Sequence, residues 1–197
     1  MSKPAQNPEI VRTQILNATI PLFSTKGFKL TMDEIAMSAR ISKKTIYQAF
    51  PKKEDLFHAM VDYIFDDIQQ GKTKIFERKD LSPDEKLVLS LNVLGEKLEN
   101  VDLSKLHVLK ERYPDVYAHV AVRLQTGWEQ TFEIMEEGIR IGLFRPFRIE
   151  IFKLMLESTL EQFFQNDFLG QNGITYDQAL HEVVELLMKG IDKQTAQ

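Results

Sequence analysis

The sequence predicts an all-α fold. Apolar residues recur at steps of three and four along most of the 197 residues, and no alternation of apolar and polar residues persists. Start and stop signals divide the chain into about nine helical segments. An apolar content of 43% with 27% charged residues is ordinary for a globular protein. We therefore expect a globular, wholly helical protein.

The first helix is expected from Glu9 to Lys26. Pro21 lies inside it, and Gly27 suits a left-handed cap at its end. Thr31 and Glu34 have the spacing of a capping box, in which each side chain satisfies the backbone amide of the other residue. These signals predict that a second helix starts directly after Thr31.

A third, short helix is expected after Ser42, a favourable N-cap residue. Ile46 and Phe50 are four residues apart and would be buried on one side. The outward side chains would be Lys43, Lys44, Thr45, Tyr47 and Gln48. The major groove of DNA admits one such helix and offers hydrogen-bonding groups to these side chains. The alternative is an ordinary helical hairpin with a solvated basic face.

Charge is unevenly distributed along the chain. The net charge is −4, but residues 1–58 contain nine bases and five acids, which leaves 16 bases and 24 acids in residues 59–197. A basic N-terminal part on an acidic body concentrates the attraction for phosphates where the short helices lie.

Residues 10–58 closely resemble, without gaps, the N-terminal DNA-binding domain of the TetR family of bacterial transcription regulators. The resemblance includes the first helix, the pair of short helices over 28–50 and the stretch Phe50-Pro-Lys-Lys-Glu-Asp-Leu-Phe57. It implies a helix-turn-helix DNA-binding domain over 1–51. It also implies a helical effector-binding and dimerisation domain over 52–197.

The second domain is expected to contain six further helices, the first of which connects it to the DNA-binding domain. Their expected ranges are 52–74, 83–100, 103–112, 114–141, 149–168 and 175–189. Ser82 and Pro83 mark the start of the second of these, and Gly142 marks the end of the fourth.

The last two helices, over about 149–168 and 175–191, carry more apolar residues than a single buried stripe requires. One explanation is a thick core within a monomer. The other is a homodimer in which both helices pair with their copies as a four-helix bundle. The resemblance favours the dimer, which would place two recognition helices about one DNA turn (~34 Å) apart on a palindromic operator.

The resemblance also assigns DNA contacts, at Thr31, Ser42, Lys43, Lys44, Thr45, Tyr47, Gln48 and Lys53. Thr31, Tyr47 and Lys53 would contact phosphates, and the others would face the groove. Three positions depart from the family pattern. Lys44 stands where glycine is frequent, Arg40 replaces a turn glycine that adopts positive φ, and Ala49 replaces a frequent Tyr or His.

Members of the family commonly bind a small molecule in the second domain, where most aromatic residues of this chain lie. The candidate lining residues are Tyr63, His107, Tyr113, Tyr117, Trp128, Phe132 and Phe152. Aromatic residues at helical spacing also form ordinary cores. If these residues line a pocket, a hydrophobic or aromatic effector is expected.

Other classes of function lack support in the sequence. There is no cysteine, no glycine-rich phosphate loop, no nucleophile elbow and no run long enough for a membrane span, so we expect a cytoplasmic non-enzyme without a cofactor. His107 with Glu111 and His181 with Glu185 have i, i+4 spacing, but such pairs more often form surface hydrogen bonds, and no metal site is expected. The expected function is ligand-responsive repression, and the alternative is a protein-interaction subunit or an activator without ligand-induced release.

Overall fold

The computed structural model describes residues 7–94, 97–98 and 108–193. These residues form helices and no strand beyond an isolated antiparallel bridge between Phe144 and Asp192, so the all-α prediction is confirmed. The helices are α1 (Pro8–Lys26), η1 (Gly27–Lys29), α2 (Met32–Ser38), α3 (Lys43–Ala49), α4 (Lys53–Phe76), α5 (Pro83–Asn92), α6 (Val108–Arg112), α7 (Pro114–Leu124), α8 (Glu129–Arg140), α9 (Ile149–Gln165), α10 (Phe168–Asn172) and α11 (Tyr176–Ile191).

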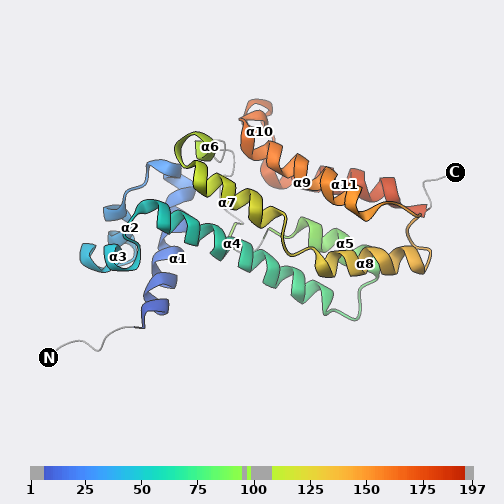
Figure 1. Ribbon diagram of the computed structural model, residues 1–197, viewed down its shortest axis with the longest axis horizontal. Helices are drawn as coiled ribbons and strands as arrows, with labels where there is room; N and C mark the ends of the chain where they lie inside the picture. The colour runs from blue at the N-terminus through green and yellow to red at the C-terminus, as the bar shows by residue number, and fades with distance from the viewer. Residues whose placement is uncertain (1–6, 95–96, 99–107, 194–197) are drawn as a thin grey trace.

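The first three helices gather at one end of an elongated molecule, which we call the head (Figure 1). Helix α4 starts in the head and runs into the remaining helices, which we call the body. Helix α7 packs along α4, and α5 packs against α4, α8 and α11. Among the described helices, none combines the length and apolar content that crossing a bilayer requires.

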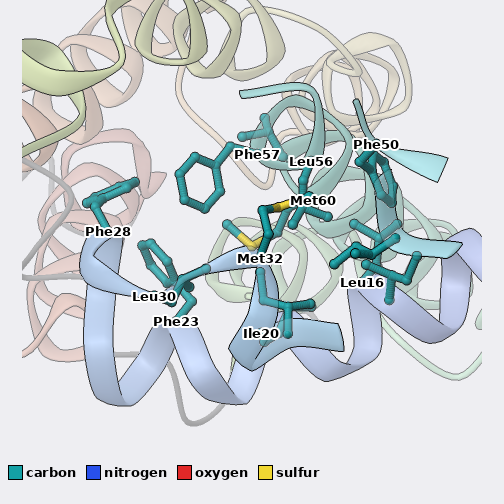
Figure 2. Close-up of a cluster of buried hydrophobic side chains, with 14 of the residues drawn as sticks. Leu16, Ile20, Phe23, Phe28, Leu30, Met32, Phe50, Leu56, Phe57 and Met60 are labelled. Atoms are coloured by element: carbon teal, nitrogen blue, oxygen red, sulfur yellow. The ribbon is translucent and has the colours of Figure 1, made fainter. Parts of the chain in front are cut away.

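Two clusters of buried apolar side chains form the core. The first joins α1, α2 and α3 to the N-terminal half of α4 and reaches Leu109 and Val116 of the body. Figure 2 shows its centre, where Phe23 and Phe28 face Phe57 of α4. The second cluster lies among α5, α8, α9 and α11 at the far end of the body. Through α4, Leu109 and Val116, the core of the head therefore extends into the adjoining part of the body.

The connecting helix therefore has two different environments along its length. Its first turns bury Leu56, Phe57 and Met60 in the core of the head. Its later turns carry Gln69 and Lys72 along the interior of the body. The boundary between the two domains, predicted after residue 51, stays a prediction. Helix α4 begins at Lys53, two residues beyond it.

The helix predicted over 114–141 is wrong, because the chain breaks between α7 and α8. Gly127 has φ +74°, and a β-carbon there would lie 2.7 Å from the side chain of Gln69. The Gln69 amide donates to the Gly127 carbonyl at 3.1 Å, which fixes the turn against α4. The sequence showed the helical pattern on both sides, but the tertiary contact decides the break.

Two other predicted helices differ in their ends. Helix α5 stops at Asn92 rather than Asn100, since Val93 has extended backbone angles. The helix predicted over 149–168 ends at Gln165, and a separate short helix follows because Asn166 is extended and its side chain accepts from the amide of Phe168 at 2.9 Å. Of the helix predicted over 103–112, only Val108–Arg112 is described as helix, and 103–107 lie outside the described residues.

Candidate nucleic-acid interface and internal cavity

The turn between α2 and α3 is built on a left-handed residue. Arg40 has φ +54°, the conformation that a glycine adopts most easily. The amide of Ile41 donates to the carbonyl of Ala36 at 3.0 Å, which closes α2 in the manner of a Schellman motif. From α1, the Gln14 side-chain amide donates to the Ala39 carbonyl at 2.7 Å. The turn is therefore fixed both by its own backbone and by the first helix.

Helix α3 is held from its inner side and at its C-terminus. Ile46 and Phe50 are fully buried in the core of the head. The Arg12 guanidinium donates to the Ala49 carbonyl at 2.6 Å and lies 4.1 Å from the centre of the Phe50 ring. A cation at a helix C-terminus is favourable because the last carbonyls carry partial negative charge. A helix of seven residues thus has a fixed orientation.

The outer face of α3 is exposed. Lys44 and Gln48 are exposed, and Tyr47 has 49% of its surface accessible. Within the described part of the chain, none of these three side chains makes a hydrogen bond or an ion pair. An ammonium, a phenol and an amide therefore project into solvent from one face of a rigid helix.

The other predicted groove residues already have partners. Ser42 caps α3, its hydroxyl accepting from the Thr45 amide at 3.1 Å and lying 2.8 Å from the Thr45 hydroxyl. The Lys43 ammonium lies 2.5 Å from the Asp33 carboxylate on α2, and this contact raises the pKa of Lys43. Part of the positive charge of α3 is thus balanced within the head.

Thr31 forms the predicted capping box at the start of α2. Its hydroxyl accepts from the Glu34 amide at 3.3 Å, and its own amide donates to the Glu34 carboxylate at 2.8 Å. Lys26 donates to the same carboxylate at 2.5 Å. The Lys26 hydrogen bond, followed by the bonds from Thr31, lowers the pKa of Glu34 to about 2. Since the Thr31 hydroxyl acts here as an acceptor, its proton remains available to an outside acceptor.

Lys53 is turned toward the protein interior. Its ammonium donates to the Phe28 carbonyl at 2.8 Å and lies 5.3 Å and 5.9 Å from the rings of Phe57 and Tyr113. Burial lowers the pKa of this lysine. In this conformation Lys53 links the head to the body, and a phosphate contact would need it to turn outward.

Residues 15–60 match the family model described as bacterial regulatory proteins of the tetR family. The match includes the later part of α1, all of α2 and α3, and the start of α4. The head is a DNA-binding domain of the TetR family. The DNA-binding class of this TetR-family regulator, inferred above from the helix pair, is therefore confirmed.

Relatives of this TetR-family chain extend the match beyond the head. The uncharacterised HTH-type regulator YvaF of Bacillus subtilis is 24% identical over 178 residues, which cover 90% of this chain and 94% of YvaF. A TetR regulator from Haloarcula marismortui has a similar fold, with a TM-score of 0.72 at 17% identity and coverage of 94% and 100%. FadR of B. subtilis, solved with stearoyl-CoA, also has a similar fold, with a TM-score of 0.61 at 21% identity. The match covers 91% of this chain and 98% of FadR. Membership of a family of regulators confirms that the chain is not an enzyme.

The body of this TetR-family chain encloses a cavity of about 160 Å³. It extends from Phe23 and Phe28 of the head, along α4 and α7, to Phe164 and Leu180 of α9 and α11. Most lining side chains are apolar. The cavity therefore adjoins the core of the head and α4 as well as the far helices.

One of the seven predicted lining residues, Trp128, lines this cavity. Three others do not line it, namely Tyr63, Tyr113 and Tyr117. Their side chains contact Asn17, the rings of Phe28 and Phe57, and Glu161, respectively. Phe132 and Phe152 pack with Trp128 and Phe147 in the second core cluster. His107 lies outside the described residues. Helical spacing could not predict which of these residues line the cavity. It shows which side chains share a face of a helix but not whether that face borders a cavity or packs against another helix.

An apolar face remains uncovered on the last long helices. Ile151, Leu154 and Met155 of α9 and Leu186 of α11 are between 51% and 71% exposed. A shallow groove runs between these helices, with Phe147 and Leu187 on its walls. The inner sides of the same helices bury Phe152, Leu156, Phe164 and Val184. The surplus apolar residues noted in the sequence therefore lie on the surface of the monomer.

Sequence reasoning missed Arg12, Gln14 and Lys72. Arg12 and Gln14 sit on the first helix and support the turn and α3 across 37 and 25 residues of chain. Lys72 lines the cavity. Each occupies an ordinary polar position of a helix, so no local signal distinguishes them from solvated residues. The one indication in the sequence is that each of the three lies next to apolar positions when the residues are projected around the helix axis.

Proposed function

We propose that this TetR-family regulator is a repressor that binds a palindromic operator as a homodimer in the bacterial cytoplasm. The observation that carries the proposal is the outer face of α3, where Lys44, Tyr47 and Gln48 are exposed and uncommitted. A lysine, an amide and a phenol at adjacent turns provide donors for base edges and phosphates.

The Lys43–Asp33 ion pair suggests how the head changes on binding DNA. In the free protein the ammonium is held by the carboxylate at 2.5 Å. A phosphate brought close to Lys43 would compete with Asp33 for the same ammonium. We therefore expect Asp33 to lower DNA affinity, and Lys43 to exchange one anionic partner for another on binding.

Dimerisation would use the face formed by Ile151, Leu154, Met155 and Leu186. Exposed apolar patches of this kind mark interaction sites. Pairing α9 and α11 with their copies would give a four-helix interface with two-fold symmetry. The same symmetry would present two α3 helices to successive turns of one face of the duplex.

A small apolar ligand in the cavity would relieve repression. The cavity is lined by Phe28 and Phe57, and the Phe28 carbonyl holds Lys53. Filling or reshaping this end would shift the head relative to α4. A coupling free energy of about 1–3 kcal/mol would weaken operator binding by roughly 5–150-fold. FadR, which has a similar fold, has been solved with stearoyl-CoA, a ligand with a long apolar chain on a polar CoA group.

Selection of bound duplexes from a random pool, followed by binding assays over a range of salt, tests the DNA-binding part. Affinity should fall steeply with salt because bound phosphates release counterions. Tyr47→Phe should weaken binding to all sequences alike, whereas Lys44→Ala should also change the selected sequence. Asp33→Asn should tighten binding to all sequences.

Two outcomes would contradict the proposal. A protein that ignores duplex DNA at low salt would be an interaction subunit that uses the same fold without DNA. An unchanged selected sequence for Lys44→Ala would remove Lys44 from base recognition and leave it a phosphate contact. Selection repeated with small apolar molecules would show whether release by a ligand accompanies DNA binding.

A further inference from the structure

The polar lining of the cavity is concentrated where α4 meets the turn between α7 and α8. Four of the side chains there are Gln69, Lys72, Arg123 and Thr126, and Tyr176 lies at the α11 end. Burial raises the pKa of Tyr176, so this phenol stays neutral. The cavity thus has one polar end in an otherwise apolar wall.

Gln69, Arg123 and Thr126 each make hydrogen bonds within the protein. Gln69 donates to the Gly127 carbonyl at 3.1 Å, and the Thr126 hydroxyl donates to the Arg123 carbonyl at 2.9 Å. Arg123 donates to Asp62 at 2.8 Å and to Asp66 at 2.6 Å, so its charge is balanced.

Lys72 differs from its neighbours. Among the described residues no carboxylate or carbonyl pairs with its ammonium, which lies 5.4 Å from the centre of the Trp128 ring. Burial lowers its pKa, because desolvation disfavours the charged form. Lys153 approaches the same ring at 5.8 Å, but its ammonium donates to the Gln125 carbonyl and lies 3.5 Å from Glu157. Lys72 is therefore a partly buried cation beside an apolar cavity, and among the described residues it lacks the kind of partners that Lys153 has.

Burying an unpaired ammonium is unfavourable unless an anion joins it. We propose that the cavity binds a ligand with an apolar body and a single carboxylate, the carboxylate pairing with Lys72 beside Trp128. A carboxylate restores the missing counter-charge, and the apolar body replaces water along the remaining walls. The inference deepens the proposed function, because it names the class of the effector.

The volume limits the apolar body. A cavity of about 150 Å³ accommodates benzene, and this one measures about 160 Å³. The matching body is a single ring or a chain of roughly six carbons. Phenylacetate and hexanoate are suitable probes, and phenylacetamide and hexanamide are their uncharged counterparts of nearly equal shape.

The test measures binding of the four probes by calorimetry or ligand-observed NMR at neutral pH. The intact protein should prefer each carboxylate over its amide by about tenfold or more, as expected for one buried charge pair. Lys72→Met should keep amide binding and lose the preference. Lys153→Met is the matched control and should retain the preference, because Lys153 does not line the cavity.

Three results would overturn the inference. They are equal binding of carboxylates and amides to the intact protein, a preference that survives in Lys72→Met, and no binding of any probe. Operator binding with and without phenylacetate is measured separately. Carboxylate binding that depends on Lys72 without any effect on DNA affinity would support this site and contradict ligand-induced release, so the two proposals fail separately.

Discussion

Arg40 is the described non-glycine residue with positive φ, at 54°. In this conformation a β-carbon approaches the following carbonyl, which costs about 1–2 kcal/mol relative to glycine. Arg40→Gly should therefore raise the free energy of unfolding by about 1 kcal/mol. The urea-unfolding midpoint, followed by circular dichroism, measures this change.

Arg40→Ala is the control for that measurement. It removes the same charge and the same long side chain but keeps the β-carbon. If alanine stabilises the protein as much as glycine does, the gain comes from charge or side-chain entropy, and the strained backbone contributes nothing.

Glu34 makes a pH-dependent contribution to the stability of the folded protein. Its pKa falls from 4.5 to about 2 in the folded protein, chiefly through the Lys26 hydrogen bond and then through the Thr31 amide. A carboxylate with a lowered pKa stabilises the folded state above its unfolded pKa, and this contribution is lost as pH falls toward the folded value. Between pH 4.5 and about 2, stability should therefore fall more steeply for the intact protein than for Glu34→Gln.

Thermal unfolding midpoints across this acid range check the expectation. Glutamine still accepts from the Thr31 amide, so the capping box itself is retained. Glu54→Gln is the control, since Glu54 is exposed and has no ion-pair partner among the described residues. Parallel curves for the intact protein and Glu34→Gln would show that this residue does not set the acid slope.

At the scale of the element, α3 is a helix of seven residues, too short to be stable by itself. Its orientation depends on the buried Ile46 and Phe50 and on Arg12 at its C-terminus. Arg12→Ala should lower the free energy of unfolding by about 1–2 kcal/mol, because the Ala49 carbonyl loses a charged donor. It should also weaken DNA binding, since α3 would no longer be held at that end.

Lys29→Ala is the control for Arg12→Ala. It shows how much of the effect of Arg12→Ala comes from the loss of one positive charge and how much from the loss of the contact that supports α3. Lys29 is an exposed base of the head that makes no hydrogen bond or ion pair within the described residues. Its substitution should leave stability nearly unchanged and alter DNA binding only through long-range charge. Urea unfolding and salt-dependent binding of both variants give the comparison, and equal stabilities would mean that Arg12 does not support α3.

For the whole molecule, the decisive test concerns the uncovered face of α9 and α11. Leu154 is 57% exposed and Leu186 is 71% exposed. If two copies pair through this face, Leu154→Glu with Leu186→Glu should give a folded monomer, because charges would be buried without partners. Light scattering reports the mass, and circular dichroism reports the fold. Operator affinity should fall strongly, since one head cannot bind both half-sites.

Val122→Glu is the matched control for the face. Val122 is 56% exposed but lies on α7, outside the groove between α9 and α11. It should leave the mass and the operator affinity unchanged. A protein that stays dimeric after both leucines are replaced would have to pair through another surface.

How far the sequence could predict this molecule depends on the range of each interaction. The capping box at Thr31, the cap at Ser42 and the buried pair Ile46 and Phe50 were predicted correctly, because all are set within four residues. The positive φ at Arg40 was implied by the family resemblance, in which a turn glycine stands at this position. The predicted ligand-binding residues stay a prediction, and Trp128 is the described one of them that lines the cavity, whose walls come from helices that are distant in the chain.

By itself the sequence determined the all-α fold, the helix pair of the head and the residues that its short second helix exposes, since helical period and capping are local properties. Only the tertiary structure decided the break at Gly127, which depends on Gln69 packing across from α4. It also decided that Lys43 pairs with Asp33, that Lys53 turns inward and that Lys72 lies beside a cavity with no ion-pair partner among the described residues. Which charges acquire partners is a matter of distances between elements, and no spacing along one helix contains that information.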